Sequence, residues 1–404
     1  MTATPTERPT ATGDADLLYT DVEESLRATV RDLLADRCAP AAVTAMFDGD
    51  RSLVTPLWRS LAVDLGLAGL LVPEHLGGAG ATAREAAVAL EELGRAVAPV
   101  PFLTSAVTAT VALLACGPEG APAAPSSSGA TADTAAVRDD LLASLAEGRR
   151  TAAPAVPFGA SVSTFEAAVR AREEGGLDGT VTSVAGALEA DLLLVPVATT
   201  GGVALHAVDV PVASSAGTLR VDPVLSLDMT RQVADVAFSG APSTRVTGPD
   251  TGAAAVRAGL LVGAALLASE QVGVAQWCLD STVAYLRGRR QFGRVVGGFQ
   301  ALKHRLADLY AAVEQARAAA RYAAATVADA DPDRLVAASL AQAYCSDVAM
   351  RAAEECIQLH GGIGMTWEHP AHLYLKRAKA DQIGLGTPGQ HRRTLAELVD
   401  VPVS

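Results

Sequence analysis

YLRGRRQFGRVVGGFQ, residues 285–300, follows a long apolar helical pattern, and CIQLHGGIG, residues 356–364, follows a second one. The first stretch carries four arginines, and arginine presents a planar, permanently charged fork of donors that suits a phosphate-bearing ligand. The second contains three glycines, which let the backbone turn sharply and approach a ligand. Either stretch alone is more typical of a solvated helix end. The functional interpretation therefore depends on finding both in this order.

The pattern R-x-Q-F-G-x-x-x-G-x-F-Q from Arg289 to Gln300, together with QLHGGIG at 358–364 and the loop VPEHLGGAG at 72–80, resembles the acyl-CoA dehydrogenase family. The resemblance covers most of the chain and is strongest towards the C-terminus. It implies a mainly α fold with a central β domain: an N-terminal helical domain, a middle antiparallel β domain and a C-terminal four-helix bundle. Composition and periodicity alone predict the same order of helices, strands and helices.

Composition sets limits on the kind of protein. A chain of 404 residues exceeds what one hydrophobic core usually serves. A net charge of −13 argues against nucleic acid as the main partner. Its five cysteines are scattered without a C-x-x-C pair, which favours a reduced, cytoplasmic protein. No metal site is predicted, because His369 and His372 lack H-E-x-x-H spacing and Pro370 interrupts the helical register between them.

Neither of the two most apolar runs of the sequence predicts a membrane-spanning helix. The longest uncharged run, residues 96–118, contains several prolines, and the more apolar run 258–269 falls short of the ~20 residues that a spanning helix needs. We therefore expect no membrane association.

Domain boundaries follow from changes in the pattern. Thr20 with Glu23, and Thr82 with Glu85, have the spacing of a capping box, so helices should begin there. The expected units are a disordered leader (1–16), the helical domain (17–150, with a flexible loop at 117–135), the β domain (151–248) and the bundle (249–404). Predicted strands cover 180–184, 190–198, 203–210 and 233–238, and predicted helices of the bundle cover 254–287, 299–328, 332–360, 371–381 and 389–399.

The resemblance implies FAD as cofactor, bound across a dimer interface so that a monomer holds it poorly. By this resemblance, one group of residues would serve the FAD of a neighbouring subunit: Arg289, Gln291, Phe292 and Gln300. A second group would form a backbone cradle for the same cofactor: Gln358, Leu359, His360, Gly361 and Gly362. A third would lie near the flavin and its pyrophosphate: Thr387, Pro388 and Gly389.

The family's reaction implies a glutamate that removes the α-proton of an acyl thioester while a β-hydride passes to the flavin. That glutamate normally occupies one of two positions, which here hold Leu385 and Gly263. Glu270 is the candidate substitute base, because it follows Gly263 by seven residues and so lies on nearly the same helix face. The alternative for Glu270 is an ordinary surface or interface carboxylate.

Besides the missing glutamates, the sequence differs from the family's pattern at a second place. This is the family's Thr-Glu-Pro-x-x-Gly-Ser loop, which covers the flavin and the thioester. AAPAVPFGASVST, residues 152–164, stands in its place. A third is Lys376-Arg377, where the family more usually has Arg-Asp.

Three hypotheses for the function follow. The first is an FAD-dependent dehydrogenase, with an unusual base or with Glu270 in that role, that desaturates an acyl thioester at the α,β-position as a homodimer or tetramer. The resemblance implies an electron-transfer flavoprotein as its electron acceptor. The second is a non-catalytic or half-site subunit of a heterotetramer in which a related chain brings the glutamate. The third is a flavin oxidase or monooxygenase on the same fold. The acyl group and its carrier are not predicted.

Overall fold

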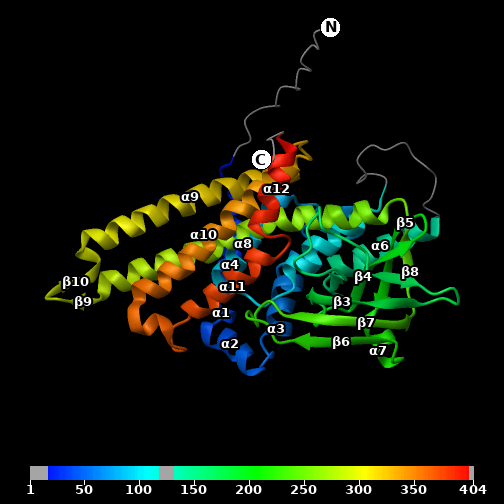
Figure 1. Cartoon of the computed structure of the whole chain (residues 1–404), viewed down its shortest axis with the longest axis horizontal. Helices are drawn as coiled ribbons and strands as arrows, with labels where there is room; N and C mark the ends of the chain where they lie inside the picture. Colours follow the sequence, from blue (N-terminus) through cyan, green and yellow to red (C-terminus); the bar gives the residue numbers. More distant parts are fainter. Residues whose placement is uncertain (1–16, 118–131, 400–404) are drawn as a thin grey trace, which may run out of the picture.

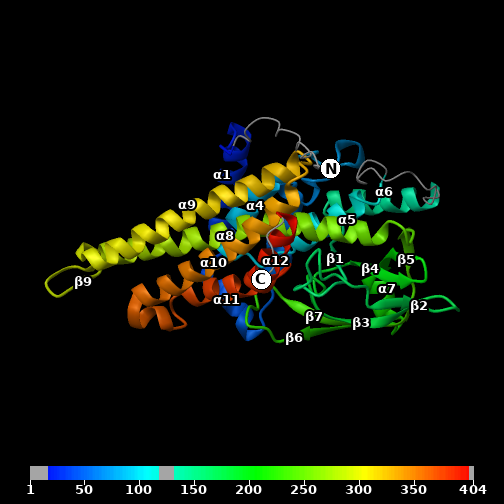
Figure 2. The same cartoon turned by 45° about the horizontal axis from the view of Figure 1, so that its top comes forward.

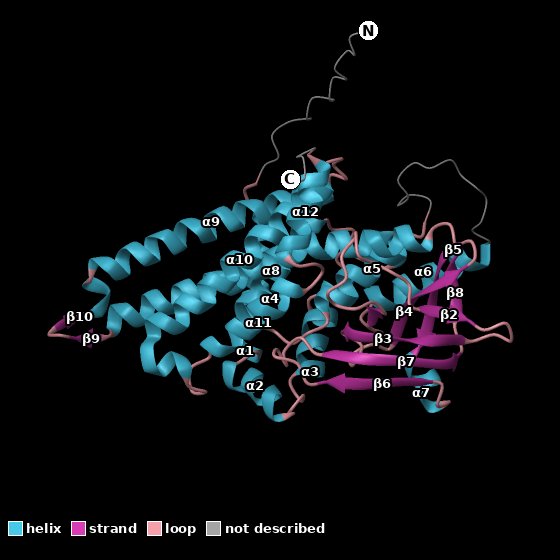
Figure 3. Cartoon of the chain, in the orientation of Figure 1, coloured by secondary structure: helices cyan, strands magenta, loops and turns pink. Residues whose placement is uncertain are grey.

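The computed structural model describes residues 17–117 and 132–399, and places helices, then a sheet, then helices along the chain (Figure 1 and Figure 3). This is the predicted fold class, with helical regions at both ends of the sequence and a largely antiparallel sheet between them. The predicted leader, residues 1–16, and most of the predicted flexible loop lie outside the described residues.

The first helical region begins at the two predicted capping boxes, and both are formed: Thr20 caps α1 with Glu23, and Thr82 caps α4 with Glu85. One helix differs from the prediction, because α6 already starts at Ala132, inside the segment expected to be loop. The elements are α1 (Asp21–Arg37), α2 (Pro40–Ala45), η1 (Met46–Asp48), α3 (Val54–Arg59), η2 (Ser60–Asp64), η3 (Leu67–Gly69), η4 (Glu74–Leu76), α4 (Ala83–Ala96), η5 (Phe102–Ala109), α5 (Thr110–Leu114) and α6 (Ala132–Ala146).

The middle region is one sheet, with strand order β6-β7-β3-β2-β4-β5-β8 and β1 beside β4. Its pairs are antiparallel except that β1 and β2 each run parallel to β4. β4 is a continuous apolar run because both of its faces are covered. The elements are β1 (Ala152–Pro154), β2 (Val169–Ala171), β3 (Leu177–Ala185), β4 (Leu192–Thr199), β5 (Gly202–Asp209), α7 (Val210–Ser215), β6 (Leu219–Val224), β7 (Val233–Ala241) and β8 (Thr244–Thr247).

The C-terminal region is a bundle whose long helices start and end close to the predicted residues. A two-stranded hairpin, β9–β10, projects from one end of it (Figure 1 and Figure 2). The elements are α8 (Gly252–Gly288), β9 (Arg290–Gln291), β10 (Arg294–Val295), η6 (Val296–Gly298), α9 (Gln300–Ala328), α10 (Arg334–His360), η7 (Gly361–Met365), α11 (Ala371–Ile383) and α12 (Pro388–Leu398).

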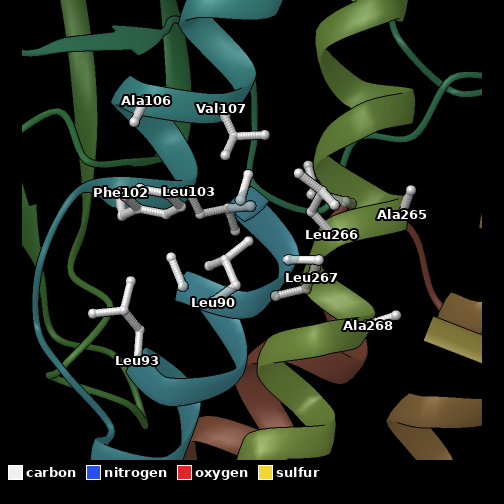
Figure 4. Packing of buried hydrophobic residues seen from close by; sticks show 14 of the residues in the cluster. Leu90, Leu93, Phe102, Leu103, Ala106, Val107, Ala265, Leu266, Leu267 and Ala268 are labelled. Atoms are coloured by element: carbon white, nitrogen blue, oxygen red, sulfur yellow. The ribbon is translucent and has the colours of Figure 1, made fainter. Parts of the chain in front are cut away.

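α8 is the central helix of the molecule. It packs against α4 and η5 through leucines, alanines and Phe102 (Figure 4). Glycines bring α8 and α4 into backbone contact: a Cβ on Gly94 would lie 2.1 Å from the carbonyl oxygen of Glu270, and one on Gly273 would lie 1.9 Å from that of Glu91. α8 is long and apolar enough to cross a membrane, but 72% of its most apolar window is buried inside the protein. This burial identifies α8 as a core helix.

Candidate functional site

The two positions that the resemblance assigns to a catalytic glutamate lie next to each other in the fold. Gly263 lies on α8 and Leu385 follows α11, yet a Cβ on Gly263 would lie 3.0 Å from Leu385 Cδ1 and 2.5 Å from Thr108 Cγ2. The main chain of Leu385 is left-handed, with φ of 55°, and its N–H donates to the carbonyl oxygen of Phe158 at 2.7 Å. Leu385 and Thr108 therefore occupy the space that a carboxylate at either position would have entered.

Around Leu385 lies a small apolar hollow between η5, the β1 loop and α8. Its free volume is about 20 Å³. Among the described residues, no ionisable side chain lines it, and Thr104 and Thr108 supply its hydroxyl groups. The lining residues are Leu103, Thr104, Thr108, Pro154, Val156, Pro157, Phe158, Ala185, Leu260 and Leu385. The hollow has room for roughly one water molecule and offers no proton acceptor stronger than a hydroxyl oxygen.

Glu270 lies elsewhere, in a buried ion-pair cluster. Its side chain is 2% exposed, Arg377 Nη1 donates to Glu270 Oε1 at 2.5 Å, and Arg231 donates to the same oxygen. Burial alone would raise the pKa of Glu270, but the charges of Arg231 and Arg377 outweigh it and hold that pKa below its usual value. A carboxylate that is stabilised in this way accepts a proton poorly.

The segment that replaces the family's flavin-covering loop is in direct contact with the turn after α11. A Cβ on Gly384 would lie 2.3 Å from Cζ of Phe158, and one on Gly386, whose φ is 105°, would lie 2.9 Å from the Cβ of Ser161. By the resemblance, the flavin ring would lie between these two segments. Their contact leaves no layer for a planar ring, so the residues present do not fit that part of FAD.

The arginine-rich hairpin, in contrast to the turn after α11, is exposed to solvent. Arg289, Gln291 and Gln300 are exposed, and Phe292 is 90% exposed, with its ring edge-on to that of Phe299 at 6.3 Å. Within residues 17–117 and 132–399, no carboxylate lies within 4 Å of a nitrogen of Arg289. A solvent-facing guanidinium without an ionic partner fits the phosphate-binding half of a dinucleotide.

The diglycine bend lies at the same end of the bundle as this hairpin. The ring of His360 stacks on that of Tyr285, near the end of α8, with centroids 4.5 Å apart. Gly361 has φ of 66°, and a Cβ there or on Gly362 would meet nothing within 4 Å, so the bend is open to a ligand. Gln358 is exposed and Leu359 half-buried. His360 itself is buried, with Nδ1 2.7 Å from the carbonyl oxygen of Cys356, so its imidazole is turned away from the surface.

The third predicted group lies at a different level of the bundle. Thr387 caps α12 through a capping box with Gln390, followed by the buried Pro388 and the exposed Gly389. This helix start packs beside Ser339, near the beginning of α10, whereas the diglycine bend follows the end of α10. The helical rise separates the two levels by ~30 Å. The structure therefore brings together the first and second predicted groups, and not the third.

Two features of this site were not predicted. Phe158 packs directly against Gly384, and Arg377 organises the buried cluster that holds Glu270. The substitution of Lys376-Arg377 for the family's usual pair was visible in the sequence. Its consequence was not, because the partner Asp228 lies 149 residues away in the chain.

Comparison with known proteins gives consistent similarities. Family profiles described as acyl-CoA dehydrogenase, N-terminal domain and C-terminal domain match residues 20–121 and 250–399. The acyl-CoA dehydrogenase IpdE2 of Mycolicibacterium smegmatis is 35% identical over 372 residues, which cover 92% of this chain and 97% of IpdE2. FadE34 of Mycobacterium tuberculosis is 33% identical over 396 residues, which cover 95% of this chain and 49% of FadE34.

A solved structure, that of the ChsE4–ChsE5 complex from Mycobacterium tuberculosis, matches with a TM-score of 0.78 at 26% identity. The match covers 96% of this chain and 100% of the chain that it matches.

Proposed function

The chain belongs to the acyl-CoA dehydrogenase family of flavoprotein oxidoreductases, and we propose that it is the base-free subunit of a heteromeric enzyme. In this enzyme a related chain carries the catalytic glutamate and the flavin ring. The complex removes two hydrogens from the α,β-position of an acyl thioester. The observation that carries the proposal is the meeting of Gly263 with Leu385, beside an apolar hollow that is lined by no carboxylate among the described residues.

The division of the cofactor site supports the same function. The cleft for the ring is closed by Phe158 against Gly384, while Arg289 and the diglycine bend face solvent at the other end of the bundle. In the proposed complex, this chain's guanidinium groups and the backbone of the bend hold phosphate oxygens of an FAD that sits mainly in the partner. Bound FAD supplies hydride acceptance, and the residues of this chain fix its position.

The relatives are compatible with two chains acting together. FadE34 is about twice as long as the segment that this chain matches, and the matched solved structure is described as a complex of two named proteins. A flavin oxidase or monooxygenase would need no glutamate, but it would need a cleft for the ring in this chain. The contacts of Phe158 disfavour that alternative.

The proposal is tested by purifying the chain alone and together with a glutamate-bearing acyl-CoA dehydrogenase chain from the same genome. We expect a colourless protein alone, and a yellow complex that an acyl-CoA substrate bleaches. Absorbance spectra and native mass spectrometry give the flavin content and the composition. A yellow single-chain preparation that acyl-CoA reduces would overturn the proposal.

A further inference from the structure

Five charged side chains are buried together where the sheet region meets the bundle. Asp228 and Arg231 come from the loop between β6 and β7, Glu270 from α8, and Arg377 and Asp381 from α11. None of these side chains is more than 8% exposed. If all were ionised, three carboxylates would face two guanidinium groups, which leaves one buried negative charge without compensation. Proteins avoid such a charge by pairing the group or by protonating it.

The hydrogen bonds are divided unequally among the three carboxylates. Arg377 donates from Nε to Asp228 Oδ2 at 2.8 Å and from Nη1 to Glu270 Oε1 at 2.5 Å. Asp381 receives one long bond from Arg231, 3.3 Å from Nε to Oδ1. Its second oxygen, Oδ2, is buried and has no hydrogen-bond partner among the described residues. Asp381 is therefore the carboxyl that the two arginines leave least satisfied.

Two glutamines that are hydrogen-bonded to Asp381 also have a buried side-chain oxygen that receives no hydrogen bond among the described residues. Nε2 of Gln271 donates to the main-chain oxygen of Asp381 at 3.2 Å, and Nε2 of Gln342 donates to it at 3.1 Å. The Oε1 atom of each glutamine is buried and unpaired. The neighbourhood thus has spare acceptors and lacks a donor. A proton on Asp381 Oδ2 would supply the donor and remove the excess charge.

We propose that the native protein holds Asp381 as a neutral carboxylic acid at neutral pH, and that this proton fastens the β6–β7 loop to the bundle. The charged groups around Asp381 are Glu270 from α8, Asp228 and Arg231 from the loop, and Arg377 on α11 itself, while α10 contributes the neutral amide of Gln342. The proposal concerns the folded chain alone, so it stands independently of the proposed function.

The direction of the pH dependence follows from the environment of the group. Burial, together with the charge of Glu270, raises the pKa of Asp381 to about 8, although Arg231 and Arg377 act in the opposite direction. A carboxyl whose pKa is raised in the closed state binds its proton more tightly there than in an opened loop. The closed state is therefore favoured at low pH, loses stability as the pH rises from the ordinary aspartate pKa towards 8, and changes little above that.

A looser loop would alter the neighbouring cavities. Thr230, Arg231 and Arg377 line a small polar hollow that shares Thr104 with the apolar hollow at Leu385. The proton on Asp381 therefore controls how firmly one wall of this region is held.

Hydrogen–deuterium exchange of residues 225–232 at pH 6 and pH 8, corrected for intrinsic exchange rates, tests the proposal. In the wild type we expect protection to fall by about tenfold or more between the two pH values. Asp381→Asn, which keeps the shape and supplies an amide donor, should show pH-independent protection. Asp347→Asn is the matched control: Asp347 pairs with Arg392 at an exposed site outside the cluster, so this variant should keep the wild-type pH dependence.

An Asp381→Asn variant that keeps the wild-type pH dependence would overturn the proposal. So would one whose protection at pH 6 falls far below that of the wild type. If Asp381→Asn does not fold, difference infrared spectroscopy of the wild type between pH 6 and pH 9 decides. The proposal expects the carbonyl band of a protonated carboxyl to disappear as the pH rises, and the absence of such a band at pH 6 refutes it.

Discussion

The two levels of the helical bundle differ in almost every physical respect. At the hairpin end, Arg289 and Phe292 project into solvent and the diglycine bend is uncovered. At the level of α12, Phe158 and Leu385 close the cleft, and the buried cluster around Arg377 ties the sheet region to the helices. The hairpin end is accessible to a ligand that this chain does not enclose. The level of α12 is filled by the chain's own side chains. This contrast points to a subunit that completes a partner's site.

The largest expected effect concerns the closed level. Arg377→Met leaves Asp228 and Glu270 buried without their main partner, and we expect it to lower the free energy of unfolding by about 3–5 kcal/mol. Urea denaturation at pH 7 measures the change. Arg392→Met is the control, because its pair with Asp347 is largely exposed and should contribute less than about 1 kcal/mol. Equal losses for the two variants would contradict the distinction.

Glu270→Gln distinguishes a catalytic role of Glu270 from a purely stabilising one. It removes the charge that pairs with Arg231 and Arg377, and we expect it to lower the free energy of unfolding by about 2–3 kcal/mol. Turnover per folded complex should stay unchanged, because Glu270 does not line the apolar hollow. Steady-state rates, normalised to the folded fraction, check this. A loss of kcat of a hundredfold or more in folded complex would restore Glu270 as the base.

Arg289→Gln tests the open level. We expect it to weaken FAD retention by the assembled complex about ten- to hundredfold, since a hydrogen bond to a charged group contributes about 1.5–3 kcal/mol. The unfolding free energy of the chain should not change, because Arg289 is exposed. Flavin fluorescence released on dilution measures the effect. Arg393→Gln, an exposed arginine on α12, is the matched control and should retain FAD normally.

Two glycines give the smallest and sharpest contrast. Gly384→Ala drives a Cβ to 2.3 Å from the Phe158 ring and should cost about 1–3 kcal/mol of stability without affecting FAD retention. Gly361→Ala meets no atom within 4 Å, so its cost of about 1 kcal/mol comes from its left-handed backbone. It should nevertheless weaken FAD retention. Thermal melts and flavin release are measured on both variants. A Gly384→Ala variant that loses FAD, together with a Gly361→Ala variant that retains it, would contradict the contrast between the two levels.

The long elements were predictable because their apolar pattern extends over many turns. The helix expected over 254–287 is α8, Gly252–Gly288, and that expected over 332–360 is α10, Arg334–His360. Strands β1, β2 and β8 of the sheet were missed, because three or four residues are too few to show an alternating pattern. β6 was missed as well, because Asp222 and Pro223 interrupt its apolar pattern. η5 was not predicted, because Pro99 and Pro101 interrupt the helical pattern just before it begins.

The candidate site was predictable only where it depends on local sequence. The hairpin and the bend follow directly from their motifs, and both lie where a ligand can reach them. The meeting of Gly263 with Leu385 depends on how α8 packs against the turn after α11. The ion pair of Arg377 with Asp228 joins segments from the bundle and the sheet region. Neither relation has a signature within a short stretch of sequence.

The close contact of α4 and α8 at their glycines limits how the protein can be divided into fragments. Because Gly94 and Gly273 place bare main chain against main chain, neither helix carries side chains there that could shield it if its partner were removed. A recombinant fragment that starts at residue 249 would expose a long apolar groove along α8, and we expect it to aggregate on expression. Residues 17–117 therefore cover an apolar face of the bundle, and expression of the protein should keep both regions on one polypeptide.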